Sequence, residues 1–269
     1  MANIVITPPG RFSLPKVSQL WEAREVLYRF GARDVTLRYR QTALGIIWVL
    51  LQPLATAAIF AVVFGKVAKL SSGGVPYVLF AFCGLLAWNL FNGIITRAAN
   101  SLVTNRDLVS KVFFPRMLVP LSTSVSTITD YLVSVAFMAI LLAVYGVAPG
   151  IAVLLVPVWT VLVILLASGL GLVAAALQVR YRDIAYVVPF LLQFLLYASP
   201  VAYAVPDKYQ WFYDINPLTW LLNEFRWSFL HQPAPPGWQI ALSVIVSLTV
   251  FLGGALVFEQ MERGFADVI

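Results

Sequence analysis

Several kinds of residue are scarce in this sequence, and each scarcity excludes a class of function. The 269 residues include one cysteine, Cys83, and one histidine, so a disulfide framework and a Cys/His metal site are excluded. The chain also lacks the GxxxxGK[ST] loop that cradles nucleotide phosphates, so any ATP-driven work requires another chain. Charged residues make up only 11% of the chain, far below the share that is usual in soluble proteins.

Apolar residues dominate instead. They occupy 61% of positions and the mean hydropathy is +0.86, which indicates a polytopic membrane protein. We expect an all-α integral membrane protein in which residues 1–269 form a single transmembrane domain. Six stretches are long enough to cross about 30 Å of hydrocarbon. They are Thr42 to Phe64, Tyr77 to Ile95, Met117 to Tyr145, Ile151 to Leu177, Ile184 to Val205 and Ile240 to Phe258.

The basic residues predict the orientation of these spans. The first forty residues contain no apolar segment with a cleavage site, so we expect no signal peptide and a cytosolic N-terminus. With six spans, fourteen of the 18 basic residues then fall on the cytosolic side, and both termini are cytosolic. This asymmetry explains the net charge of +6 without any binding of nucleic acid.

A polar and basic stretch, Arg97 to Arg116, separates the second and third spans. From Asn105 onward its apolar residues recur at helical spacing on one side, and Pro115 ends this short helix. We interpret it as a docking element for a cytosolic partner; an amphipathic loop resting on lipid headgroups is the alternative. The basic turn Arg180 to Asp183 is a second contact candidate. The apolar side of the first candidate, the short helix that begins at Asn105, consists of Leu108, Val109, Val112 and Phe113.

Residues Val17 to Arg33 have the pattern of a helix that lies in the membrane surface. Apolar residues share one side, and the opposite side carries Glu25 and Arg29 at the i,i+4 spacing of a helical ion pair. The helix is either a plain membrane anchor or a collar near a cytosolic entrance. The nearby aromatic residues Tyr39 and Trp48 likewise allow two interpretations, as interface anchors or as rings that face a passage for sugars.

Asp130 is the only carboxylate deep inside the predicted spans. A charge there costs roughly 2.5 to 3.5 kcal/mol, so Asp130 should face protein or water, not lipid. In the fourth span, Ala167, Gly171 and Ala175 form a small-residue face for close helix contact.

The segment from Pro206 to Pro233 is moderately apolar but carries several charges. A transmembrane crossing would place Glu224 and Arg226 in hydrocarbon, so we expect a hairpin that dips into the outer leaflet and returns. Asn216 as N-cap and Pro217 at the first helical position start its second limb. This hairpin serves either packing alone or an outer gate.

Five motifs in order connect the chain to a known family. LRYRQTALGIIWVLLQPL, NRDLVSKVFFPRMLVPLS, RYRDIAYVVPFLLQFLLYASPVAY, NPLTWLLNEFRW and FEQMERGFADVI together resemble the permease subunits of bacterial polysaccharide ABC exporters, of the ABC type-2 class. The similarity covers nearly the whole chain. The ending MERGFADVI is most similar to the O-antigen branch, although teichoic-acid and capsule exporters share much of the pattern.

This resemblance implies a homodimer in the bacterial inner membrane, joined to two cytosolic ATPase subunits that hold ATP and Mg²⁺. The cargo would be a polysaccharide linked to undecaprenyl pyrophosphate, and membrane lipid would surround the dimer. The resemblance also implies residue roles. The ATPase-coupling residues are Asn105, Arg106, Asp107, Leu108, Val109, Val112, Phe113, Pro115, Arg180, Tyr181, Arg182 and Asp183; the polysaccharide channel has Tyr39, Trp48, Tyr197 and Tyr203; the periplasmic gate, residues 206–232, has Asn216, Pro217, Trp220, Glu224 and Arg226.

Two competing functions remain open from the residues. An ion-coupled secondary transporter usually needs several intramembrane carboxylates, and only Asp130 is present. A membrane-embedded transferase would need clustered acids or a metal site, whereas the cytosolic acids here lie scattered beside basic residues. The sequence therefore favours a transport subunit that is not an enzyme and holds no cofactor of its own.

Overall fold

The computed structural model describes residues 21–40, 46–107, 114–205 and 207–265. Within these ranges the chain consists of helices and turns without a strand, so the predicted all-α class is confirmed. The α-helices are α2 (Arg24–Tyr39), α3 (Ile46–Phe60), α4 (Tyr77–Thr104), α6 (Leu118–Val144), α7 (Val156–Arg180), α8 (Ile184–Ala198), α9 (Gln210–Tyr213), α10 (Pro217–Leu230) and α11 (Gly237–Glu262). The π-helical η1 (Ala61–Val67) extends α3, and the 3-10 helices η2 (Ile151–Leu155) and η3 (Asp207–Tyr209) precede α7 and α9.

Among the described residues, five helical segments are long and apolar enough to cross a membrane, and each contains most of a predicted span. They are Ile47–Val67, Tyr77–Thr104, Leu118–Val144, Ile151–Arg180 and Gly237–Glu262. The predicted span from Ile184 to Val205 is not one continuous helix, because α8 ends at Ala198 after 15 residues. Pro200 explains this end: the residue before a proline avoids helical geometry, and Ser199 is extended, with φ −108° and ψ 143°.

The central helix of the bundle is α4, which packs against α3, α6, α7 and α10. α4 continues past Ile95, the predicted end of the second span, to Thr104, so Arg97 lies within a helix. No proline or glycine interrupts this part of the chain. Arg97 remains in the helix because its guanidinium contacts Ser126 and Asp130 of α6, so its charge does not face hydrocarbon.

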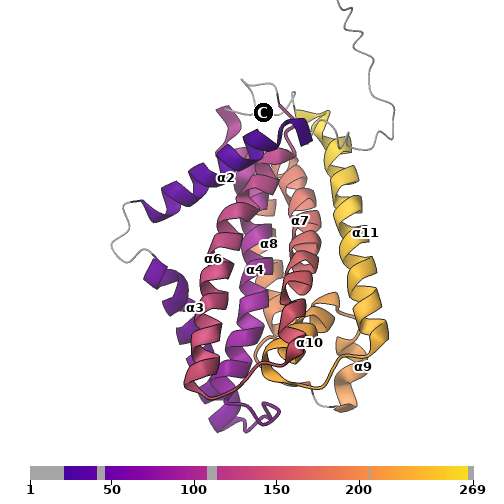
Figure 1. The fold of residues 1–269 in the computed structure, drawn as a ribbon. Helices are drawn as coiled ribbons and strands as arrows, with labels where there is room; N and C mark the ends of the chain where they lie inside the picture. Colours follow the sequence, from indigo (N-terminus) through magenta and orange to yellow (C-terminus); the bar gives the residue numbers. More distant parts are fainter. Residues whose placement is uncertain (1–20, 41–45, 108–113, 206, 266–269) are drawn as a thin grey trace, which may run out of the picture.

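At one end of the bundle, α2 lies across the other helices, and α9 and α10 lie at the opposite end (Figure 1). The predicted ion pair between Glu25 and Arg29 is confirmed at 2.6 Å, and the guanidinium lowers the pKa of Glu25. α2 continues six residues beyond the predicted end, to Tyr39. Gly31 contacts Val125 of α6 so closely that a Cβ there would lie 2.7 Å from the valine Cβ.

Small residues let α7 approach its neighbours, as predicted. Ala167 and Ala175 are completely buried, and a Cβ on Gly171 would lie 2.8 Å from the Cβ of Ala98 in α4. The closest approach is one that the sequence did not single out. A Cβ on Gly254 of α11 would lie 2.2 Å from the backbone oxygen of Gly169, so a side chain there would separate the two helices.

We therefore expect Gly254→Ala to destabilise the protein by about 1–3 kcal/mol, the usual cost of overpacking a close contact. The adjacent Gly253 is a matched control, because nothing lies within 4 Å of a Cβ built on it. Gly253→Ala should leave stability unchanged or slightly raised. Thermal unfolding of the purified protein in detergent measures both variants, and equal midpoints for the two would contradict this account of the α7–α11 contact.

Candidate functional site

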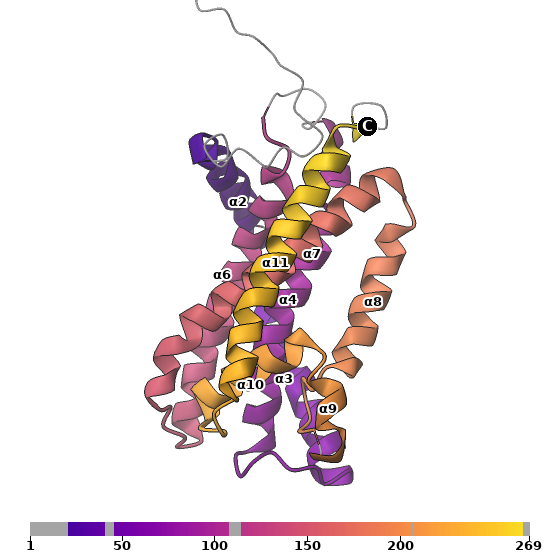
Figure 2. The ribbon, with the colours of Figure 1, turned by 90° about the vertical axis from the view of Figure 1, so that its right-hand side faces the viewer.

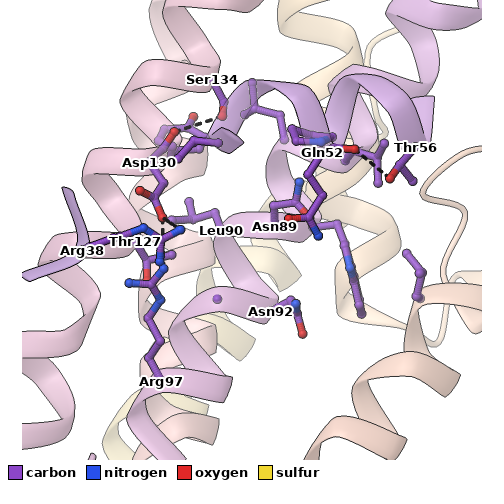
Figure 3. A pocket seen from close by; sticks show the side chains of 18 residues that line it. Arg38, Gln52, Thr56, Asn89, Leu90, Asn92, Arg97, Thr127, Asp130 and Ser134 are labelled. Atoms are coloured by element: carbon purple, nitrogen blue, oxygen red, sulfur yellow. Dashed lines mark hydrogen bonds and ion pairs between the residues drawn. The ribbon is translucent and has the colours of Figure 1, made fainter. Parts of the chain in front are cut away.

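A polar cavity of about 370 Å³ lies between α3, α4 and α6, where the end of α2 reaches them. Figure 3 shows its walls: charged side chains on one side and amide side chains on the other. The amides are Gln52 of α3 and Asn89 and Asn92 of α4. Such a mixture of charge and amides inside a membrane bundle is a candidate functional site, because polar groups at this depth are costly and are rarely placed without a role.

Asp130 is the centre of the charged wall. Its Oδ2 atom lies 2.8 Å from Nη2 of Arg38 and 3.1 Å from Nη2 of Arg97, and its Oδ1 atom accepts a hydrogen bond from the Tyr39 hydroxyl. Arg97 also donates from Nη1 to Ser126 Oγ at 2.6 Å. The prediction that Asp130 faces protein or water is confirmed, and its partners come from α2 and α4.

Tyr39 therefore lies in this network, at the C-terminal end of α2. Burial, with the adjacent Asp130 carboxylate as a further cause, raises the pKa of Tyr39 to about 12, so the hydroxyl stays protonated and acts as the donor. The sequence analysis named neither Arg38 nor Arg97 as a site residue. The need of the deep Asp130 carboxylate for a counter-charge was the available signal, but sequence spacing alone does not show that three separate helices bring Arg38 and Arg97 to it.

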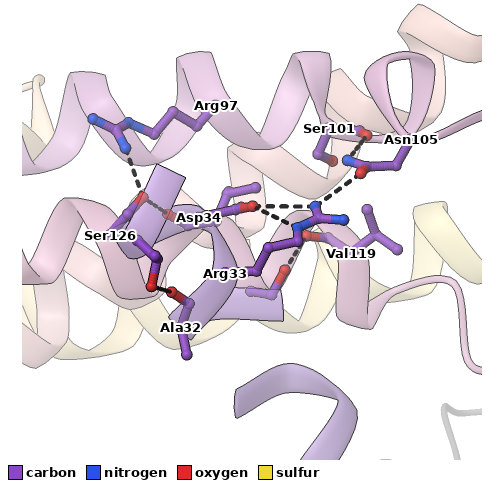
Figure 4. A network of polar contacts seen from close by, with 11 residues as sticks. Ala32, Arg33, Asp34, Arg97, Ser101, Asn105, Val119 and Ser126 are labelled. Atoms are coloured by element: carbon purple, nitrogen blue, oxygen red, sulfur yellow. Dashed lines mark hydrogen bonds and ion pairs between the residues drawn. The ribbon is translucent and has the colours of Figure 1, made fainter. Parts of the chain in front are cut away.

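A second polar network joins α2 to the end of α4 (Figure 4). Nη2 of Arg33 donates to Oδ1 of Asn105 at 2.9 Å, and the same guanidinium lies 3.1 Å from Asp34. Asn105 also donates to the carbonyl of Ser101 at 2.8 Å, so it caps the end of α4. The first predicted coupling residue is thus held by α2.

The other predicted coupling residues that the structure describes lie at the same end of the molecule. Arg106 and Asp107 are exposed, and Pro115 is half-buried, with its carbonyl accepting from the Leu118 amide at 3.0 Å. Leu108, Val109, Val112 and Phe113 lie outside the described residues. The second predicted contact site is exposed at the junction of α7 and α8. It is the turn formed by Arg180, Tyr181, Arg182 and Asp183.

The four predicted channel rings do not lie together. Tyr39 contacts Asp130, Trp48 is 58% exposed on α3, and the Tyr203 hydroxyl donates to the Tyr197 carbonyl at 2.7 Å. A different set of rings shares one face of α8, and it includes Tyr197. We call this set the α8 ring stripe; its members are Tyr186, Phe190, Phe194 and Tyr197, which are 82%, 69%, 66% and 61% exposed.

The stripe follows from helical periodicity, because its members are three or four residues apart. The sequence therefore contained the signal, although only Tyr197 was singled out. What the spacing does not reveal is that this face is unpacked. Figure 2 shows why: α8 stands at the edge of the bundle, apart from α11, so that its outer face meets no other described helix.

The predicted gate segment forms α9 and α10. Asn216 is confirmed as N-cap, since its side chain accepts from the Leu218 amide at 3.0 Å, and Pro217 begins the helix. Trp220 donates to the carbonyl of Asp214 at 2.9 Å.

The two charged residues of α10 are both buried and do not pair with each other. Glu224 accepts from Ser243 of α11 at 2.8 Å. Arg226 instead donates to the carbonyls of Pro200 and Val201, and its guanidinium lies 4.0 Å from the ring centroid of Phe80. Each charge thus fixes α10 to a different neighbour.

Comparison with known proteins identifies the family to which this chain belongs. The model of the ABC-2 type transporter family matches residues 26–230, which is most of the chain. The chain belongs to this family. The ABC-2 chain is 27% identical to the O-antigen export system permease protein RfbA of Myxococcus xanthus over 258 residues, which cover 94% of the chain and 98% of the relative.

More distant relatives of this ABC-2 permease follow the same pattern. A Klebsiella pneumoniae RfbA with the same printed name is 25% identical over 242 residues, covering 88% of the chain and 92% of the relative. The polysialic acid transport protein KpsM of Escherichia coli is 25% identical over 241 residues, covering 86% and 91%. Together with the apolar helices, these matches make the protein a multi-pass membrane permease of a transporter. Among the described residues, no cluster of His, Cys, Asp and Glu suitable for a metal ion occurs.

Proposed function

We propose that this ABC-2 permease forms the membrane channel of an ATP-driven exporter that moves a lipid-linked polysaccharide of the O-antigen class across the inner membrane. The names of the most similar relatives given above support this cargo, and their full-length coverage supports a shared architecture. The lipid carrier in this proposal is undecaprenyl pyrophosphate. The permease itself carries out no chemical reaction.

The working assembly in this proposal contains two permease chains and two ATPase subunits, which bind ATP and Mg²⁺. The ATPases would contact the end that carries Asn105 and the turn Arg180 to Asp183, where exposed basic residues gather. Since this basic end is cytosolic under the positive-inside rule, both termini are cytosolic and α9 and α10 are periplasmic. α8 and the turn and bend residues 199–205 together make the sixth crossing in this arrangement.

The observation that carries the proposal is the α8 ring stripe. A long sugar polymer must pass without being held, so its route needs many weak contacts and few fixed charges. Aromatic faces offer such contacts to the apolar faces of sugar rings. The stripe presents four rings along one side of α8 and no charged residue between them. Facing the same helix of a second copy, it would line a passage for the polymer.

Replacing Phe190 and Phe194 together with Ala tests this function. We expect export of surface polysaccharide to fall about tenfold, since each lost aromatic contact is worth about 0.5–1.5 kcal/mol. Pulse labelling of polysaccharide at the cell surface measures export, and co-purification of the ATPase shows that assembly is intact.

The matched control removes two exposed apolar side chains from another span. Ile245 and Leu252 of α11 are 54% and 56% exposed, and changing both to Ala should leave export unchanged. If the Phe190/Phe194 variant exports at the normal rate, the stripe is a lipid-facing surface and the proposed route through it is wrong.

A further inference from the structure

The cavity between α3, α4 and α6 carries an excess of positive charge. Arg38 and Arg97 both contact a single oxygen of Asp130, so two guanidinium groups share one carboxylate. The other Asp130 oxygen is occupied by Tyr39. Each guanidinium presents more N–H donors than these contacts use, and the three charged side chains are 38%, 26% and 15% exposed, so part of each arginine remains accessible.

The opposite wall adds hydrogen-bond donors that have no acceptor among the described residues. The side-chain amides of Gln52 and Asn89 make no hydrogen bond to any other described residue, and both line the cavity (Figure 3). Asn92 accepts a long contact from Thr96, 3.5 Å, and its amide N–H groups remain available. Gln52 and Asn89 are exposed, so their amides are accessible, and amides that face two arginines across a cavity can surround a ligand with several acceptor oxygens.

This chemistry selects an anion. A metal cation would be repelled by the two guanidinium groups, and a neutral sugar would leave the excess charge uncompensated. A phosphate or diphosphate has the oxygen acceptors and the negative charge that both walls require, and arginine binds it through its planar fork.

The position of the cavity indicates that this anion belongs to a lipid. The outer side of α3, which forms one wall, is exposed at Ile47, Trp48 and Leu51, so only one helix separates the cavity from the surrounding membrane. A headgroup can reach it from the side while its hydrocarbon chain remains in lipid.

We propose that this cavity is a binding site for the phosphate or diphosphate headgroup of a lipid, held by Arg38 and Arg97 and by the amides of Gln52 and Asn89. In the empty site Asp130 keeps the two arginines together, and an incoming phosphate competes with it for their N–H groups. Two sources share this chemistry: the diphosphate that joins a lipid to its polysaccharide, which rests on the proposed function, and the phosphate of a membrane phospholipid, which does not.

Gln52 is the best position for a test, because its amide has no described partner whose loss would disturb the fold. Changing Gln52 to Glu places a carboxylate across from the arginines, and Gln52→Lys adds a third cation. Binding of three radiolabelled probes to the purified full-length permease in nanodiscs would be measured: undecaprenyl diphosphate, undecaprenol without phosphate, and phosphatidylglycerol. Gln52→Leu serves as a control that removes the amide without changing charge.

We expect undecaprenyl diphosphate to bind, with at least tenfold lower affinity in Gln52→Glu, higher affinity in Gln52→Lys and a smaller change in Gln52→Leu. Phosphatidylglycerol that binds with the same order of variants, when the diphosphate does not, supports the phosphate site and identifies the phospholipid as its source. Equal affinities in all variants, or undecaprenol binding as tightly as its diphosphate, would overturn the proposal.

Surface polysaccharide measured in cells with the same variants separates this inference from the proposed function. Diphosphate affinity and export that change together identify the cargo headgroup as the ligand. If the wild-type chain exports no polysaccharide, the proposed function fails, and the binding measurements still decide whether the cavity holds a lipid phosphate.

Discussion

Replacing Arg226 with Met is expected to unfold or misassemble much of the protein, with a loss of about 3–5 kcal/mol. Arg226 is 4% exposed, and its guanidinium is the hydrogen-bond donor for the carbonyls of Pro200 and Val201. Those carbonyls belong to the bend that follows α8, where no helical N–H is available to them. Met fills a similar volume but leaves both acceptors unsatisfied in a buried place.

Glu224→Gln is the matched control, two residues earlier on the same helix. Glu224 is fully buried, and its Oε2 atom has no hydrogen-bond partner among the described residues. Gln retains an acceptor for Ser243 and removes a buried acid, so we expect stability to stay within about 1 kcal/mol of wild type or to rise. Thermal unfolding in detergent and the yield of inserted protein measure both variants. An Arg226→Met protein as stable as Glu224→Gln would contradict the role assigned to the guanidinium.

The second large effect is expected at Asp130. Replacing it with Asn removes the only described counter-charge of Arg38 and Arg97, and it should cost stability near the lower end of the ~3–5 kcal/mol typical of broken buried ion pairs, because the arginines are partly exposed. Tyr39 also loses a charged acceptor. Unfolding of the purified protein at several salt concentrations measures the loss.

A compensating substitution distinguishes charge from packing at this site. Asp130→Asn combined with Arg38→Gln leaves Arg97 as the one charged member of the three, so the site has the same net charge as in the wild type. The double variant should therefore be more stable than Asp130→Asn alone. A double variant as unstable as the sum of the two single changes would show that the network acts through shape instead of charge.

A structural feature of this protein could be predicted from the sequence when it depends on residues that are close together in the chain. The long apolar runs predicted five of the six expected spans, and the Asn216–Pro217 pair predicted the start of α10, because hydropathy and capping depend on neighbouring residues. The end of α8 was also readable, from Pro200. The extension of α4 through Arg97 was not, because the residue that neutralises Arg97 is 33 positions away on another helix.

The site shows the same division. The sequence established that Asp130 needs a polar partner, but it did not identify Arg38 or Arg97, since burial and pairing are properties of the packed bundle. The ring stripe had a visible spacing, yet exposure of that face depends on how α8 stands relative to α7. The coupling residues between positions 108 and 113 remain predictions from the sequence.

α2 contacts both the end of α4 and the interior of α6, through two of its residues that are close in sequence. It therefore connects two sites that are far apart in the chain. Arg33 binds Asn105 at the end of α4, and five residues later Arg38 binds Asp130 inside α6. We therefore expect a displacement of Asn105 to shift Arg38, and a ligand that draws Arg38 away from Asp130 to act on Asn105. Thermodynamic reciprocity makes the two effects equal in free energy. An ATPase engaged beside Asn105 would then alter the affinity of the cavity by the same factor by which an occupied cavity alters the affinity for the ATPase.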